Sequence, residues 1–273
     1  MQNSVKNNRI KRIIVWITIV VFCAFMAVLE WIPIPFVKDV WRNAIYNKIL
    51  QQACGLTAAI VFLCFLRIRL FGKIHNWLYL LPCIVVAVNN FQWWSYFSGY
   101  QQLVRQNVAD ITLFATYCLL VGLFEEFVFR GILFSALASV FPKNKKGLLT
   151  TFVFSSCIFG LTHLLNGNVL QALYSILTGG LFAFVLIKTQ NLLCCGVIHG
   201  LYNFCGLLMD KASNLGLGNG VKLFNWGTIL TMGSVVVLMI VFVVYSLIKH
   251  AETERKTLYQ RLSVKDDDNI GEN

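Results

Sequence analysis

Eight long apolar runs constrain this 273-residue chain more than any other feature. A helix needs roughly 20 mainly apolar residues to cross the hydrocarbon core of a bilayer, and about 17–25 are tolerated. Runs of this kind cover residues 13–31, 49–66, 77–97, 108–128, 148–165, 168–187, 192–209 and 224–248. They predict an all-α fold, a polytopic transmembrane helix bundle with about eight spans.

Composition supports a membrane environment and argues against a separate soluble domain and against nucleic-acid binding. Hydrophobic residues make up 58% of the chain and charged residues 13%, against about 45–50% and about 25% in ordinary soluble domains. No long polar segment remains for a separate soluble domain, so any chemistry is expected among the helices. The net charge of +11 comes from Lys and Arg residues that border the apolar runs, where they set orientation in the bilayer. We therefore expect a multi-pass protein of the cell membrane that does not bind nucleic acid.

The distribution of basic residues also predicts how the chain is divided and oriented. With a cytoplasmic N-terminus, most Lys and Arg residues fall in segments on the cytoplasmic side, as the positive-inside rule requires. An even number of spans then places both termini there. The predicted parts are a basic cytoplasmic N-terminus (1–12), membrane helices (13–107), a membrane core (108–209), a last loop and helix (210–250) and a polar cytoplasmic tail (251–273).

Two carboxylates and a guanidinium interrupt the fourth apolar run. A charged residue at the centre of a bilayer costs roughly 2.5–3.5 kcal/mol on insertion scales, so this group needs compensation or a function. Glu126 and Arg130 are spaced i,i+4 and predict an ion pair on one helix face. Glu125 lies about 100° further round the helix and stays available as a general base. The apolar run continues to about Val140, which predicts a helix that is long, kinked or broken near Gly131.

Two further pairs of polar or aromatic residues lie in later runs, each at helical spacing. Phe159 and His163 share one helix face, and His199 and Asn203 share another. Together with Glu125 they supply the parts of a hydrolytic site. Glu125 and His163 can activate a water molecule, and His199 and Asn203 can donate hydrogen bonds to the oxyanion of a tetrahedral intermediate.

The motifs Glu-Glu-x-x-x-Arg, Phe-x-x-x-His and His-x-x-x-Asn, in this order, resemble the CAAX protease and bacteriocin-processing family, also called the abortive-infection family. The resemblance covers roughly residues 109–206. It implies a membrane-embedded endopeptidase in which the first glutamate and first histidine activate water, while the second histidine and the asparagine stabilise the oxyanion. Relatives cleave prenylated CAAX tails, peptide precursors or membrane proteins, and some are linked to bacteriocin immunity.

The resemblance leaves the use of a metal open. The family is often described as metalloproteases, and a carboxylate with two histidines can bind Zn²⁺ with one open position. Glu125, His163 and His199 would be the ligands. The same side chains also suit metal-free activation of water, which we favour.

Two classes other than proteases also fit buried ionisable residues. A transporter could use them as a proton or ion path, although we find no internal repeat of the kind that marks many transporters. A non-enzymatic immunity or scaffold protein could use them to fix helix packing.

Overall fold

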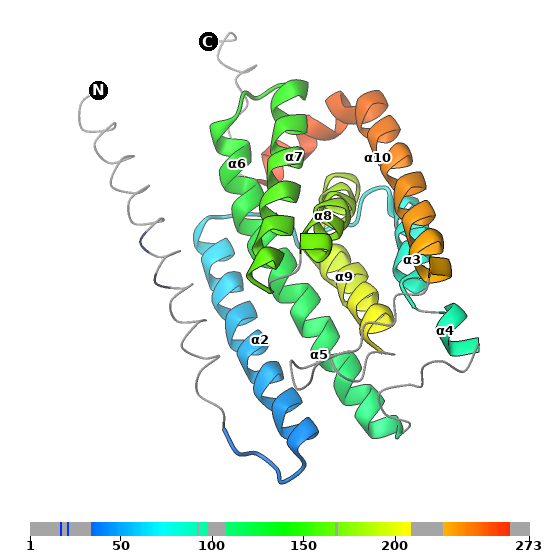
Figure 1. The fold of residues 1–273 in the computed structure, drawn as a ribbon. Helices are drawn as coiled ribbons and strands as arrows, with labels where there is room; N and C mark the ends of the chain where they lie inside the picture. Colours follow the sequence, from blue (N-terminus) through cyan, green and yellow to red (C-terminus); the bar gives the residue numbers. More distant parts are fainter. Residues whose placement is uncertain are drawn as a thin grey trace, which may run out of the picture.

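The computed structural model describes residues 34–91, 93–97, 107–166, 169–208 and 226–262, together with Ile17 and Val21. Within these ranges all regular structure is helical, which confirms the predicted fold class for this part of the chain. The predicted first span, 13–31, lies outside the described residues apart from those two positions. The helices, shown in Figure 1, are α2 (Val40–Phe65), α3 (Leu80–Asn89), α4 (Trp93–Phe97), α5 (Val108–Glu126), α6 (Phe134–Val140), α7 (Lys145–Thr162), α8 (Val169–Thr189), α9 (Leu192–Leu207) and α10 (Trp226–Arg261), with the short 3₁₀-helices η1 (Trp77–Tyr79) and η3 (His163–Asn166) and the π-helix η2 (Phe127–Leu133).

Four helical segments are long and apolar enough to cross a membrane, namely Val40–Phe65, Val108–Val140, Gln171–Thr189 and Ile229–Lys249. Two further apolar segments, Trp77–Asn89 and Leu192–Leu207, are shorter. The predicted span 77–97 is divided, because α3 ends at Asn89 and α4 begins at Trp93. The total of eight spans and the side on which the termini lie stay predictions.

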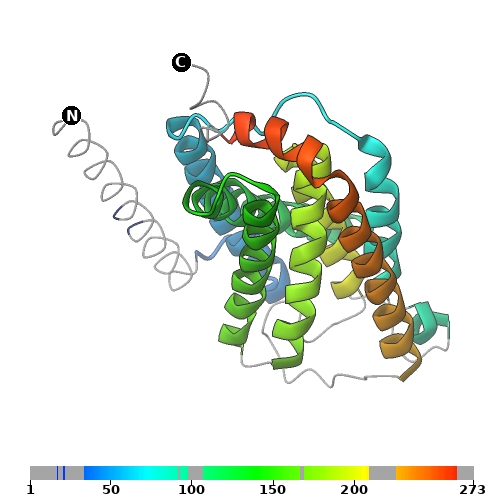
Figure 2. The same cartoon turned by 90° about the horizontal axis from the view of Figure 1, so that it is seen from above.

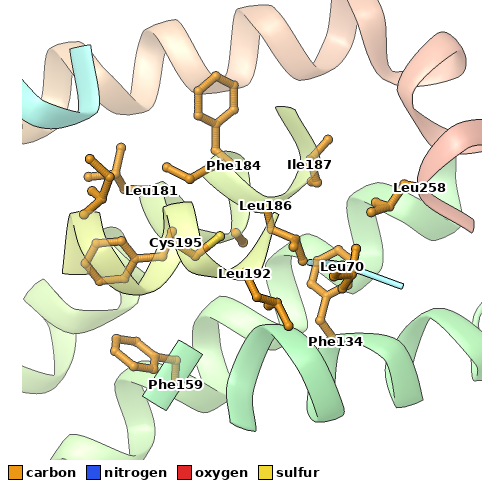
Figure 3. Packing of buried hydrophobic residues seen from close by; sticks show 14 of the residues in the cluster. Leu70, Phe134, Phe159, Leu181, Phe184, Leu186, Ile187, Leu192, Cys195 and Leu258 are labelled. Carbon is orange, nitrogen blue, oxygen red and sulfur yellow. The ribbon is translucent and has the colours of Figure 1, made fainter. Parts of the chain in front are cut away.

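Helix α8 occupies the centre of the bundle. In its apolar stretch 72% of the residues are buried by other parts of the protein, against 17% for α2 and α10. Figures 1 and 2 show α5 beside α9, and α7 beside α8. Side chains of α8 such as Leu181, Phe184 and Leu186 fill the apolar core (Figure 3). The outer helices instead expose large apolar side chains, including Leu238 and Val241, as expected of surfaces in contact with lipid.

Three glycines let α5 and α9 cross with their backbones in contact. A Cβ atom on Gly122 would lie 2.4 Å from the backbone nitrogen of Gly200 and 2.6 Å from the carbonyl oxygen of Gly196. Small residues allow this kind of approach between helices in membranes, and Gly196-x-x-x-Gly200 is the spacing typical of it. The crossing brings Glu126 on α5 next to His199 on α9.

Gly122→Ala is expected to destabilise the protein by about 1–3 kcal/mol, since the new methyl group would meet backbone atoms that cannot rotate away. The free energy of unfolding in detergent micelles measures this effect. Gly233→Ala on α10 is the matched control, because a Cβ atom there would have no neighbour within 4 Å. Equal stability of the two variants would show that the tight crossing is absent.

Of the three alternatives predicted near Gly131, a long, kinked or broken helix, the structure has the long helix. α5, η2 and α6 form one 33-residue helical segment, Val108–Val140, and Gly131 lies inside the π-helical part. At 1.5 Å per residue, Glu126 is about 27 Å from Val108 and about 21 Å from Val140. The carboxylate is therefore near the middle of the longest apolar segment.

The tail predicted at residues 251–273 is not solvated throughout, because α10 continues to Arg261 and several of its side chains from Glu254 onward are buried. Leu258 and Tyr259 are fully buried, and Leu262 is nearly so. These three side chains share one helix face, and the tail therefore packs despite its polar composition. Figure 2 shows this end of α10, in red, lying across the ends of other helices, and Figure 3 shows Leu258 near Leu70.

Polar contacts fix the same end of α10 to the end of α8 and to the residues around Lys73 and Gln190. Glu254 forms a buried ion pair with Lys188 at the end of α8. Arg261 donates hydrogen bonds to the carbonyl oxygens of Lys73 (3.2 Å) and Gln190 (3.0 Å) and to Nε2 of His75 (2.7 Å). Burial and the neighbouring cations Arg261 and Lys73 lower the pKa of His75, which suits its role as acceptor.

The packing of this segment predicts that Leu258→Ala lowers the free energy of unfolding by at least about 2 kcal/mol, as large-to-small core substitutions do. Lys256→Ala, an exposed position two residues earlier, should change it by less than about 0.5 kcal/mol. Thermal unfolding of both variants in detergent provides the comparison. A Leu258→Ala protein as stable as wild type would restore the solvated-tail interpretation.

Candidate active site

A chain of buried charged groups links α5 to α9. Glu126 Oε2 lies 3.1 Å from Nε of Arg130, and both side chains have no exposed surface. The other oxygen of the same carboxylate, Oε1, accepts a hydrogen bond from Nδ1 of His199 at 2.8 Å. The predicted Glu126–Arg130 pair is thus present, and the carboxylate has a second partner 73 residues away in the chain. Glu126 is fully committed to these two contacts.

Helices α7 and α8 complete the surroundings of Arg130. Its Nη2 donates to the carbonyl oxygen of Gly179 at 2.7 Å. Its Cζ lies 4.5 Å from the ring centroid of Phe159 and 5.7 Å from that of Phe182, distances at which a guanidinium is attracted to an aromatic face. A Cβ atom at Gly179 would lie 2.9 Å from the Phe159 ring, so this glycine allows ring and carbonyl to approach the cation together.

Glu125 has a different environment from its neighbour. Its side chain is 26% exposed, and its Oε2 lies 3.8 Å from Nε2 of His199. That distance is too long for a hydrogen bond. Oε2 itself is buried and has no hydrogen-bond partner among the described residues. Glu125 therefore faces Nε2 of His199 without a hydrogen bond, and part of its side chain remains exposed.

The two histidines meet the same aromatic ring. Phe159 is buried, and its ring centroid lies 4.9 Å from that of His163 and 5.8 Å from that of His199. His163 is half-buried where α7 ends, and its Nδ1 donates to the carbonyl oxygen of Phe159 at 3.0 Å. Within the described residues no hydrogen bond or ion pair joins His163 to Glu125. The bond at Nδ1 leaves Nε2 of His163 as the nitrogen available for chemistry.

Asn203 follows His199 by one turn of α9 and is half-buried. Its side chain makes no hydrogen bond to the other residues that the structure describes, so its amide remains available to a ligand. Asn203 thus lies at the helical spacing from His199 that the sequence predicted.

The residues as arranged do not fit a three-ligand zinc site. Among the described residues, no group of three or more His, Cys, Asp or Glu side chains is placed to hold a metal ion. The Nδ1 atoms of His163 and His199 contact the carbonyl oxygen of Phe159 and the carboxylate of Glu126, so only Nε2 of each ring could bind a metal. We therefore derive no step through a metal, and zinc bound by Glu125, His163 and His199 stays an alternative for experiment.

Sequence reasoning missed the contribution of α8, namely the carbonyl oxygen of Gly179 and the ring of Phe182. Neither residue type carries a signal of its own in an apolar helix. The close crossing of α5 and α9 was also missed, although Gly196-x-x-x-Gly200 flanks His199 and could have indicated it.

Comparison with known proteins agrees with this geometry. Residues 107–205 match the family model Rce1-like, described as type II CAAX prenyl endopeptidase Rce1-like. Neither a curated protein nor a solved structure matches the chain significantly. The matched segment contains all three motifs and every charged group of the site, and four helices could cross a membrane. These findings support a membrane protease of the CAAX type. Residues 107–205 thus resemble the CAAX protease family, as the motifs predicted.

Proposed function

We propose that this protein is a multi-pass endopeptidase of the cell membrane that hydrolyses lipidated or membrane-associated peptides with a water molecule activated by Glu125. The observation that carries the proposal is the different environment of two adjacent glutamates. Glu126 is buried and bonded to Arg130 and His199. Glu125 is partly exposed, and its Oε2 faces Nε2 of His199. A general base must have access to water and to the substrate, and only Glu125 has it.

The proposed reaction begins when Glu125 takes a proton from water, helped by Nε2 of His163. The oxygen of that water then attacks the carbonyl carbon of the scissile peptide bond. Negative charge develops on the carbonyl oxygen, where Asn203 and His199 donate hydrogen bonds. Collapse of the tetrahedral intermediate breaks the C–N bond. The proton held by Glu125 passes to the leaving nitrogen, which gives an amine and a carboxylate.

The contact between His199 and Glu126 determines which protonation form of His199 the proposed reaction requires. Nδ1 donates its proton to Glu126, so Nε2 can donate to an oxyanion only in the imidazolium form. The carboxylate of Glu126 would face that positive charge from the other side of the ring. Arg130 in turn holds Glu126, and the buried chain sets the position of the donor.

The test is cleavage of a mixed panel of prenylated CAAX peptides and leader-type peptides by the purified protein in detergent. Cleavage by the wild type that is lost in Glu125→Gln supports the proposal. Equal cleavage by both proteins would overturn the assignment of Glu125 as the general base. Cleavage of only the prenylated or only the leader-type peptides would assign the substrate class.

A chelator arm separates the two mechanisms of water activation. Retained cleavage after dialysis against a zinc chelator supports metal-free catalysis. Loss of cleavage that added Zn²⁺ restores would instead assign Glu125, His163 and His199 as metal ligands.

A further inference from the structure

Helix α8 carries none of the three sequence motifs, yet one of its aromatic rings contacts the centre of the site. The ring of Phe182 stacks on the imidazole of His199 with centroids 4.3 Å apart and an interplanar angle of 18°. Phe182 is 1% exposed. It lies three residues after Gly179, so both residues share the face of α8 that is directed at Arg130 and His199.

Three contacts fix the orientation of the His199 ring. Glu126 holds Nδ1, the ring of Phe159 lies at 78° to the imidazole, and Phe182 covers one of its faces. A hydrogen bond at one nitrogen still allows the imidazole to tilt about the bonded atom. The flat contact with Phe182 removes this freedom, and it thereby determines where Nε2 points relative to Glu125.

A second buried aromatic on the same helix shows that this contact is more than general core packing. Phe184 is also fully buried, but its neighbours are Tyr79 and Phe242, with ring centroids 5.8 and 6.1 Å away. Figure 3 shows Phe184 on the side of α8 that faces away from Phe159. Two residues of the same type and burial thus differ in whether they contact the site.

From this geometry we infer that Phe182 is a positioning residue of the proposed hydrolysis, which acts by holding His199 so that Nε2 faces the reacting carbonyl oxygen. The inference rests on the proposed function for its chemistry. The stacking of Phe182 on His199, in contrast, is observed in the structure whether or not the protein hydrolyses peptides. It assigns to α8 a part in the site that the three motifs do not contain.

The kinetic test compares Phe182→Leu with Phe184→Leu on a peptide that the wild type cleaves. Misplacement of a catalytic group by about 1 Å can cost about 10²-fold in rate, so Phe182→Leu should lower kcat by about 10- to 100-fold with KM nearly unchanged. Both leucine variants should lower Tm by similar amounts, because both rings are buried. Phe184→Leu should nevertheless keep kcat within about two-fold of wild type. Phe182→Tyr, which retains the ring face, should recover most of kcat. Equal kcat in both leucine variants would overturn the inference.

A spectroscopic arm keeps the inference testable without turnover. Selective ¹⁵N labelling of histidine, with the His199 signals assigned by their loss in His199→Gln, reports the hydrogen bonding of the ring nitrogens. Phe182→Leu should shift or broaden the His199 signals, and Phe184→Leu should leave them unchanged. Unchanged His199 signals in Phe182→Leu would refute the positioning role. Altered signals together with an active Glu125→Gln protein would refute only the proposed mechanism.

Discussion

Glu125→Gln is expected to reduce kcat for peptide hydrolysis by about 10²–10⁴-fold, the range attributed to a positioned general base. Glutamine has nearly the same shape but cannot accept the proton of the attacking water. Glu125 is partly exposed, and its Oε2 makes no hydrogen bond to the described residues, so the substitution breaks no hydrogen bond there. Tm should therefore stay close to the wild-type value. Kinetics on a cleaved peptide and thermal unfolding of the same preparation measure both quantities.

Glu126→Gln is the matched control for this prediction, since it makes the same chemical change one residue later. Here the carboxylate bonded to Arg130 and His199 is lost, so we expect a clear fall in Tm together with lower activity. The opposite result, with Glu126→Gln stable and inactive and Glu125→Gln active, would exchange the roles of the two glutamates.

Arg130→Met is expected to destabilise the protein by about 3–5 kcal/mol. Removing one partner of a buried ion pair leaves the other charge without compensation, and Glu126 has no exposed surface through which water could solvate it. Methionine fills much of the arginine volume, so the loss is mainly electrostatic. Unfolding in detergent, followed by circular dichroism, measures the change.

Two companion variants separate this electrostatic loss from other effects. Adding Glu126→Gln to Arg130→Met removes the uncompensated carboxylate and should recover part of the lost stability. Lys146→Met removes an exposed cation near the start of α7 and should cost less than about 0.5 kcal/mol. A loss of similar size in Lys146→Met and Arg130→Met would show that Glu126 is not buried against Arg130.

Those parts of the site that depend on spacing along one helix could be predicted from the sequence. The i,i+4 pairs Glu126–Arg130 and Phe159–His163 occur as contacts, because helix geometry alone brings such residues together. The fold class followed in the same way from the length of the apolar runs.

The contacts between helices could not be predicted in this way. The second bond of Glu126, to His199, depends on how closely α5 and α9 cross, and the bond of Arg130 to Gly179 depends on a bare carbonyl oxygen. Composition also misled the interpretation of residues 254–262, since three apolar side chains on one face are buried in a segment that is polar on average.

Because of the π-helix at Phe127–Leu133, the site depends on the number of residues in this segment. A π-helical turn holds more residues than an α-helical turn, so this segment is an α-helix with surplus backbone between the glutamates and α6. Deleting one of the residues between Glu126 and Arg130 would let the segment relax to regular α-helix and would change the spacing of this pair from i,i+4 to i,i+3. Every side chain of the site could then be present, while Glu126 and Arg130 faced different neighbours. The number of residues between Glu125 and Leu133 thus matters as much as their identity.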